Sequence, residues 1–294
     1  MIQKLTFPKA FSSFLESNKK TINIMFSIVS SFKKHIPDSY QYSDKHPPLL
    51  EHYKYTDKLY IGCILHIAKN SHSWNSFLGP IPGKQVHKRF REYINYGYFS
   101  ELFNVSIKNY ISLKDEIHLL STDSTNIFNK SCIELHTRNP YFKNKKSCKV
   151  STIVDSKGSP LSLSISDSDE HDSKQFEVVF NNMITNEDVK DKIKENTTLL
   201  GDKGYDSLKV RTTIRNSKIK PIISYNKRNC KNVAKIKKLT EEESKIYKSR
   251  IKVEHFFSII KRYPKINNVY EKTINSYFNL VFLIAASINI NRSN

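Results

Sequence analysis

The spacing of apolar residues changes near residue 115 and divides the chain into two regions. Before this point, apolar residues recur at helical spacing, which predicts helices over 59–70, 85–95 and from Gly97 to about 110. After it, short apolar and β-branched runs predict strands over 116–123, 147–155, 159–166, 196–202 and 219–225. Helical patterns occur between and after these runs, over 171–184, 206–217, about 240–262 and about 273–290.

Turn and cap residues refine this outline. Ser156, Lys157 and Gly158 predict a hairpin between the second and third strands. Asp172 or Ser173 is expected to cap the helix over 171–184, and Asp206 the helix over 206–217. The order strand, hairpin, helix, strand, helix, strand, helix predicts an α/β fold with a mixed sheet flanked by helices. This order is compatible with an RNase H-like core.

We therefore expect an all-α region over 1–115 and a catalytic α/β domain over 116–294. The basic faces of the short helices in the first region fit a DNA-binding module, although plain helical packing explains the same pattern. Residues 1–45 show no strong period and are expected to form a loosely held helical arm, which ends before the break at 46–48.

Charge narrows the function. Lys and Arg number 48 against 28 acidic residues, giving a formal net charge of +20, which favours a polyanionic partner such as nucleic acid. A basic but inert surface that reflects AT-rich coding is the alternative. The four cysteines are scattered, no secretory signal is evident, and the apolar stretch over 278–286 is too short to span a bilayer. We expect an intracellular protein without a membrane partner, in the cytoplasm or nucleoid of a prokaryote, or otherwise in a nucleus or viral factory.

Three carboxylates are the strongest candidates for chemistry. Asp123 and Asp202 each end an apolar run that predicts a buried strand, and Glu254 lies on the helix over 240–262. Two strand-end carboxylates and one helix carboxylate suit a two-metal phosphodiester site, because Mg²⁺ prefers carboxylate oxygens. A single strand-end Asp is more often a turn residue, so the inference depends on all three together.

The helix that carries Glu254 has two distinct faces. Val253, Phe256 and Ile260 point toward a core. At about 100° per residue, an opposite arc of roughly 60° holds four functional-looking side chains, namely Tyr247, Arg250, Glu254 and Lys261. Such a face can ligate metal and neutralise phosphates, but an Arg250–Glu254 pair on a solvated helix is an open alternative.

These residues resemble a known family, the DDE transposases of bacterial insertion sequences in the group called insertion-sequence four and five. Its signature Y-x2-R-x3-E-x6-K fits the four residues above at every spacing. Its other blocks occur in order: TDST around Asp123, KVSTIVDSKGSPL (149–161), HDS (171–173) and GDKGYDS (201–207). The segment 74–103 is similar to the family's helical region, and 138–146 to its basic stretch after the first Asp. The resemblance covers about residues 55–290.

The resemblance implies an RNase H-like fold and DNA transposition. Asp123, Asp202 and Glu254 would be the catalytic, metal-binding triad, with two Mg²⁺ or Mn²⁺ ions per active site. The partners would be double-stranded DNA, at terminal inverted repeats and at the target, and a second copy of the chain on paired ends. Expected DNA contacts are Tyr247, Arg250, Lys261, Lys203, Arg138, Lys143, Lys88 and Arg89.

Other interpretations remain open at this stage. A domesticated sequence-specific DNA-binding protein or an RNase H-like nuclease would share many of these features. His171 and Asp172 would either approach the metal site or serve only to cap a helix, and Trp74 is expected in the core. The Lys- and Asn-rich loop over 227–238 is expected to contact DNA or to be solvated.

Overall fold

The computed structural model describes residues 9–33, 55–70, 72–135, 137–139, 144–226 and 238–293. Three expectations fall outside these ranges: the break at 46–48, the DNA contact of Lys143, and the loop over 227–237.

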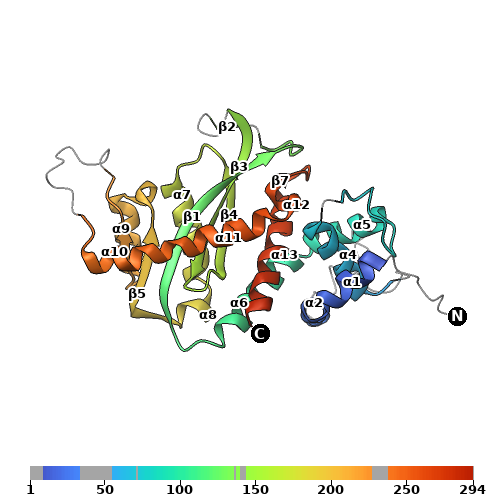
Figure 1. Ribbon diagram of the computed structural model, residues 1–294, viewed down its shortest axis with the longest axis horizontal. Coiled ribbons are helices and arrows are strands. Elements are labelled where there is room, and N and C mark those ends of the chain that lie inside the picture. Colours follow the sequence, from blue (N-terminus) through green and yellow to red (C-terminus); the bar gives the residue numbers. More distant parts are fainter. Residues whose placement is uncertain are drawn as a thin grey trace.

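A mixed sheet forms the larger half of the molecule (Figure 1). In order across the sheet its main strands are β4 (Pro160–Asp167), β3 (Lys145–Asp155), β1 (Ile117–Asn129), β5 (Ile193–Gly201) and β6 (Lys220–Ile223). The pairs β4–β3 and β3–β1 are antiparallel, whereas β1–β5 and β5–β6 are parallel. The short strands β2 (Arg138–Asn139) and β7 (Asn268–Val269) extend β3 and β1. This strand order confirms the predicted α/β class and the RNase H-like fold.

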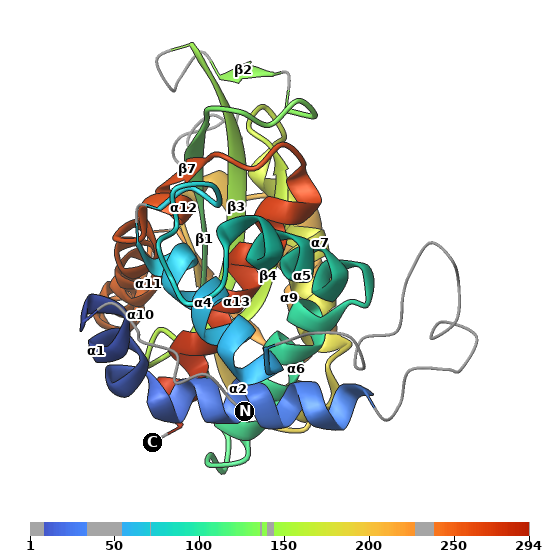
Figure 2. The ribbon, with the colours of Figure 1, turned by 90° about the vertical axis from the view of Figure 1, so that its right-hand side faces the viewer.

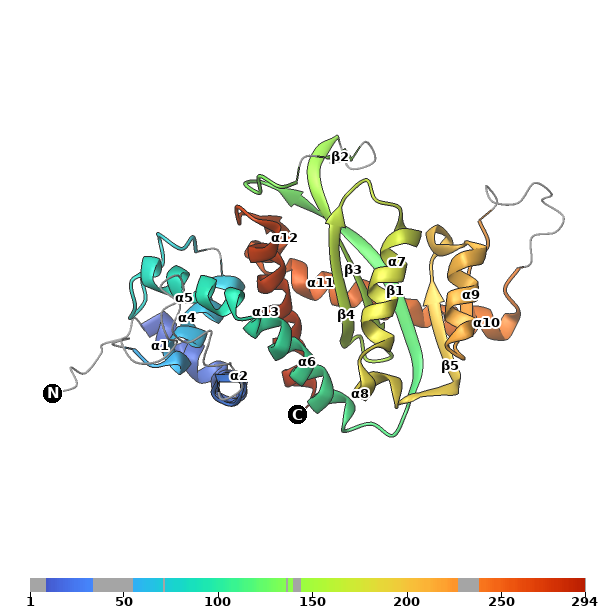
Figure 3. The same cartoon turned by 180° about the vertical axis from the view of Figure 1, so that it is seen from behind.

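Helices cover both faces of the sheet. The helices α7 (Asp172–Ile184) and α9 (Leu208–Asn216) lie on one face, and the short α8 (Glu187–Lys190) links α7 to β5 (Figure 3). The helix α11 (Ile251–Lys261) crosses the opposite face over β1 and β3. The central strands therefore have buried side chains on both sides, as in β3, where Cys148 through Asp155 are all buried.

The smaller half is a group of helices (Figure 2). Their bounds are α1 (Lys9–Ser17), α2 (Lys19–Lys33), α4 (Asp57–Lys69), α5 (Gly83–Asn95) and α6 (Tyr98–Ile111). Phe11, Ile22, Met25 and Val29 are buried against this group. The described part of the N-terminal segment is therefore packed, and the expectation of a loosely held arm is wrong there.

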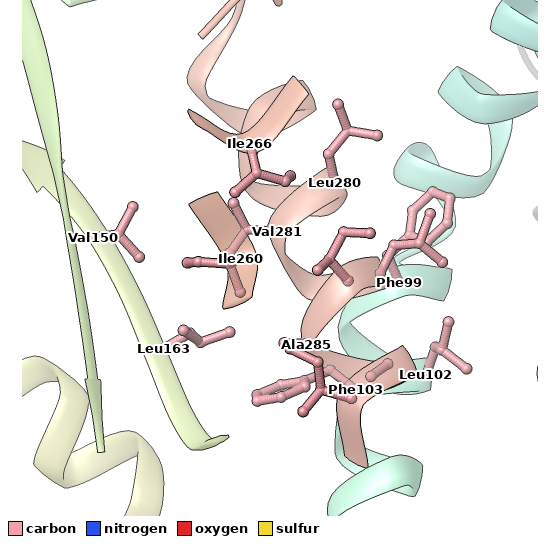
Figure 4. Close-up of a cluster of buried hydrophobic side chains, with 14 of the residues drawn as sticks. Phe99, Leu102, Phe103, Val150, Leu163, Ile260, Ile266, Leu280, Val281 and Ala285 are labelled. Atoms are coloured by element: carbon pink, nitrogen blue, oxygen red, sulfur yellow. The ribbon is translucent and has the colours of Figure 1, made fainter. Parts of the chain in front are cut away.

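The C-terminal helix α13 (Ile274–Arg292) lies between the helical group and the sheet. Figure 4 shows Leu280, Val281 and Ala285 of this helix between α6 side chains, including Phe103, and sheet side chains such as Leu163. Of the helices that the structure describes, α13 alone has the length and hydropathy to cross a membrane, and 67% of that window is buried inside the protein. A core helix meets the same criteria, and the bounds of α13 agree with the helical pattern predicted over about 273–290.

Several local predictions need correction. Strand β1 does not end at Asp123 but continues to Asn129, because residues 124–128 still pair with β3 and Asn129 pairs with β7. Ser207, not Asp206, caps α9, while Asp206 accepts hydrogen bonds from Arg211 and the Asn226 amide. Neither Asp172 nor Ser173 is the cap of α7, which begins after His171 without a side-chain cap.

The helix predicted over 240–262 is divided by a tight turn. It consists of α10 (Glu241–Tyr247), a 3₁₀ turn η4 (Lys248–Arg250) and α11. Chain direction is nevertheless kept through the turn, and Val253, Phe256 and Ile260 are fully buried as expected. The hairpin between β3 and β4 is also as predicted, with Gly158 at a left-handed φ of 79° that favours glycine.

Candidate active site

Two neighbouring parallel strands bring Asp123 and Asp202 together. Leu120 pairs with Leu199 and Ser121 with Leu200, so the same register continued by two residues places Asp123 beside Asp202. Strand β5 ends at Gly201, and the Asp202 carboxylate accepts a hydrogen bond of 2.7 Å from the Gly204 amide. This bond caps the short 3₁₀ turn η1 (Lys203–Tyr205) and fixes the carboxylate at the end of the strand.

The Asp123 carboxylate lies in a partly desolvated setting. The pKa of Asp123 is raised to about 6, chiefly by burial and to a smaller extent by the nearby negative charge of Asp202. The Ser124 amide, which donates a 2.8 Å hydrogen bond, and the Arg250 guanidinium oppose this shift. The raised pKa thus reflects mainly the loss of solvent around this carboxylate.

Arg250 connects the sheet to the helix. Its guanidinium donates to Asp123 Oδ2 at 2.8 Å and to Glu254 Oε1 at 2.5 Å. Lys261 lies about two turns after Glu254 on α11. It donates to Thr125 on β1, and burial lowers the pKa of this lysine. The predicted polar face of the helix therefore lies against β1, and Tyr247 is half-buried at the end of α10.

Asp172 is a fourth carboxylate at this place. Its Oδ1 accepts hydrogen bonds from Ser124 at 3.0 Å and from the Lys149 ammonium at 2.9 Å. Asp172 therefore does not cap α7; His171 occupies the N-cap position without a side-chain cap, and the contacts of Asp172 hold it next to the residue after Asp123. The sequence signal was weak, because the partners of Asp172 lie 48 and 23 residues away.

The donor set is chemically suited to a hard divalent cation, since carboxylate oxygens are the ligands that Mg²⁺ and Mn²⁺ prefer. Gly204, which has no side chain, leaves open the space between the carboxylates of Asp202 and Asp172. A Cβ there would lie 2.9 Å from Asp202 Oδ1 and 3.2 Å from Asp172 Oδ2. Within the described ranges, however, no three His, Cys, Asp or Glu side chains are close enough to hold one ion together. Arg250 engages two of the three predicted ligands instead.

The remaining predicted DNA contacts lie in different settings. Lys88 on α5, Arg138 on β2 and Lys203 are exposed. Arg89 is only 1% exposed, and its guanidinium bonds Asp57 and Glu92. A direct DNA contact by Arg89 is contradicted by this burial, because its donors point into the helical group. Trp74 is buried and donates to Glu271, which confirms its expected core position.

A comparison with known protein families matches the region of the chain that contains these carboxylates. A model of the family described as "Transposase DDE domain" matches residues 122–290. Among curated proteins, none matches the chain.

Two solved structures are similar to it. One is described as the crystal structure of a pre-cleavage Mos1 transpososome, with a TM-score of 0.28. The other is the Mos1 transposase paired-end complex with left transposon end, with a TM-score of 0.27. Each is 12% identical, and each match covers 74% of this chain and 80% of the other. The fold assignment rests on the strand order. The family match spans more than half of the chain, and the chain therefore belongs to the transposase DDE domain family.

Proposed function

We propose that this protein is an active transposase that cleaves DNA at the terminal inverted repeats of an insertion sequence and transfers the freed strands. The observation that carries the proposal is the meeting of Asp123 and Asp202, on and at the end of adjacent parallel strands, with Arg250 at the end of η4 and Glu254 on α11. All four lie in the region that matches the DDE domain.

Asp123, Asp202 and Glu254 would hold Mg²⁺ or Mn²⁺, two ions per active site in our proposal. When bound, the ions supply a more acidic attacking water or 3′-hydroxyl and neutralise charge on the reacting phosphate. Asp123 and Asp202 already share one place, whereas Glu254 is paired with Arg250. Glu254 would have to exchange this partner to act as a ligand.

The basic residues would position DNA. Arg250 and Lys261 present cations beside the carboxylates, where a planar guanidinium suits phosphate oxygens. Tyr247 lies one turn before Arg250, at a suitable place to contact a transposon end. Exposed Lys88, Arg138 and Lys203 would add backbone contacts, with the net charge of +20 strengthening them.

The two regions of the chain would have different functions, and two copies of the chain would assemble. The helical region over 1–115 would bind the transposon ends, and the domain over 116–294 would perform catalysis. Two copies would act on paired ends, as the family resemblance implies.

A cleavage assay tests the proposal. Labelled duplexes that carry both ends of the protein's own genomic locus would be incubated with Mg²⁺ or Mn²⁺ and wild-type protein, Glu254→Gln or Glu241→Gln. Glu241 is an exposed glutamate in the first turn of α10, so its variant is a matched control for loss of one charge. We expect cleavage at the ends by the wild type and the control, and a loss of at least 100-fold in Glu254→Gln with DNA binding retained.

Two outcomes would contradict the proposal. Specific binding of the ends without cleavage by any protein would indicate a DNA-binding protein with a vestigial site. Preferential cleavage of RNA–DNA hybrids over duplex ends would indicate a nuclease.

A further inference from the structure

We propose that Asp172 is a fourth carboxylate of the active site and helps Asp202 to hold a divalent cation. This inference rests on the proposed function, because it adds a residue to the same site. Asp172 comes from α7, on the face of the sheet opposite to α11, so the site would receive carboxylates from three directions.

The first argument is that one oxygen of Asp172 is fixed. Oδ1 accepts from Ser124, the residue directly after Asp123, and from Lys149 on β3. The Lys149 side chain is only 10% exposed, and its ammonium also donates to the Glu170 carbonyl at 2.5 Å. Two hydrogen bonds to one oxygen, one of them from a buried lysine that is itself held by the Glu170 carbonyl, leave the Asp172 carboxylate with little rotational freedom.

The second argument concerns the other oxygen. Oδ2 of Asp172 and Oδ1 of Asp202 both face the α-carbon of Gly204, within 3.2 Å of the position that a Cβ would take. The backbone of Gly204 is not left-handed, so conformation does not require glycine here. A side chain at this position would crowd both carboxylate oxygens, whereas glycine leaves the space between them open.

The third argument is electrostatic. Asp172 and Asp202 are like charges facing a common space, and the nearby Asp123 is paired with Arg250. One ammonium, that of Lys149, contacts this group from the side of Oδ1. Like charges held close together raise the free energy of the folded protein unless a cation offsets them. A divalent cation bound between Oδ2 of Asp172 and Asp202 would relieve this repulsion.

The test measures metal binding without DNA. Binding of Mn²⁺ would be followed by electron paramagnetic resonance and calorimetry for wild type, Asp172→Asn and Asp169→Asn. Asp169 is exposed and three residues earlier, so its variant loses the same charge nearby. We expect Asp172→Asn to weaken Mn²⁺ binding by about 10- to 100-fold and Asp169→Asn to change it less than threefold. Equal affinity of Asp172→Asn and wild type would overturn the proposal.

A double variant separates metal binding from neutralisation of Lys149. If Asp172 served only as the counter-ion of Lys149, Lys149→Met combined with Asp172→Asn would restore wild-type affinity. We expect no restoration, and full restoration would overturn the proposal.

Gly204→Ala tests the site with Asp172 in place, should Asp172→Asn fail to fold. We expect at least a tenfold loss of Mn²⁺ affinity, since the added Cβ occupies the space between the carboxylates; unchanged affinity would contradict the inference. Because these measurements require no DNA cleavage, a failure of this inference can be distinguished from a failure of the proposed function. A wild type that binds Mn²⁺ through Asp172 but cuts no DNA would refute only the latter.

Discussion

Two arginines in this protein each join an aspartate to a glutamate, and they do so in opposite settings. Arg89 in the helical group bonds Asp57 and Glu92, with side-chain exposures of 2%, 11% and 15%. Arg250 bonds Asp123 and Glu254, with exposures of 20%, 22% and 51%. The charges are of the same kind, and the arginine lies three or four residues before its glutamate in both cases.

The difference lies in what surrounds each arginine. Tyr93 donates a 2.6 Å hydrogen bond to Asp57, and the Arg89 guanidinium stacks near the Tyr60 and Tyr93 rings. Every partner around Arg89 is thus supplied by the protein. Glu254 is half in solvent and Arg250 can exchange partners. A buried ion-pair network such as that of Arg89 supports the fold, whereas a partly solvated one such as that of Arg250 is available to a ligand. The local sequence does not distinguish the two.

The largest effect is expected from removal of Arg89. Arg89→Met would leave Asp57 and Glu92 buried without their cation, which typically costs about 3–5 kcal/mol of unfolding free energy. Urea denaturation of the variant and the wild type measures this cost. A loss below about 1 kcal/mol would mean that the network is dispensable, and the comparison would fail.

Acid titration should act on the two regions with opposite signs. Burial lowers the pKa of His66 in the helical group to about 4, so the folded state binds fewer protons than the unfolded state between about pH 6.5 and 4. Its contribution to stability therefore falls as pH drops through this window. Asp123 has a pKa raised to about 6, so its contribution rises as pH drops from about 6 to 4.

Single substitutions in metal-free protein separate the contributions of His66 and Asp123 to the pH dependence of stability. His66→Leu should flatten the acid loss of stability, and Asp123→Asn should steepen it, each by up to about 1.4 kcal/mol per pH unit. Unfolding free energies at pH 7, 5.5 and 4.5 measure the slopes. Parallel slopes for all three proteins would contradict both assignments.

The smallest effect on stability is expected from Arg250→Met. Glu254 remains solvated, and Asp123 can bind a proton, so the loss should be below about 1 kcal/mol. DNA cleavage should nevertheless fall by at least 100-fold if Arg250 binds phosphate as proposed. A stability loss as large as that of Arg89→Met would remove the distinction between the two networks.

The sequence predicted most of the fold because its periodicities are clear. The strands over 147–155 and 159–166 and the buried face of α11 required only apolar spacing. The end of β1 was misplaced because Asp123 to Asn126 are polar, and a polar run normally indicates a turn. In this fold the run stays in the sheet because its backbone pairs with β3.

What the sequence could not predict depends on distant partners. Arg89 belongs to a basic run that favoured DNA contact, but its burial follows from Asp57, 32 residues earlier. Asp172 occupied a capping position, and only tertiary structure placed Ser124 and Lys149 beside it. Patterns along the chain identify the apolar and polar faces of each helix or strand. Which distant residues those faces contact is known only from the folded structure.

The central position of α13 has a consequence for how the protein is made. The helix α13 follows in the chain all the elements between which it packs, and Asn291 near its end accepts a hydrogen bond from Thr21 on α2. The apolar surfaces of α6 and the sheet that face α13 therefore stay exposed until this helix has been synthesised. A gene copy with a stop codon before residue 274 would yield a chain with these surfaces uncovered, which is expected to be degraded and not to occupy DNA.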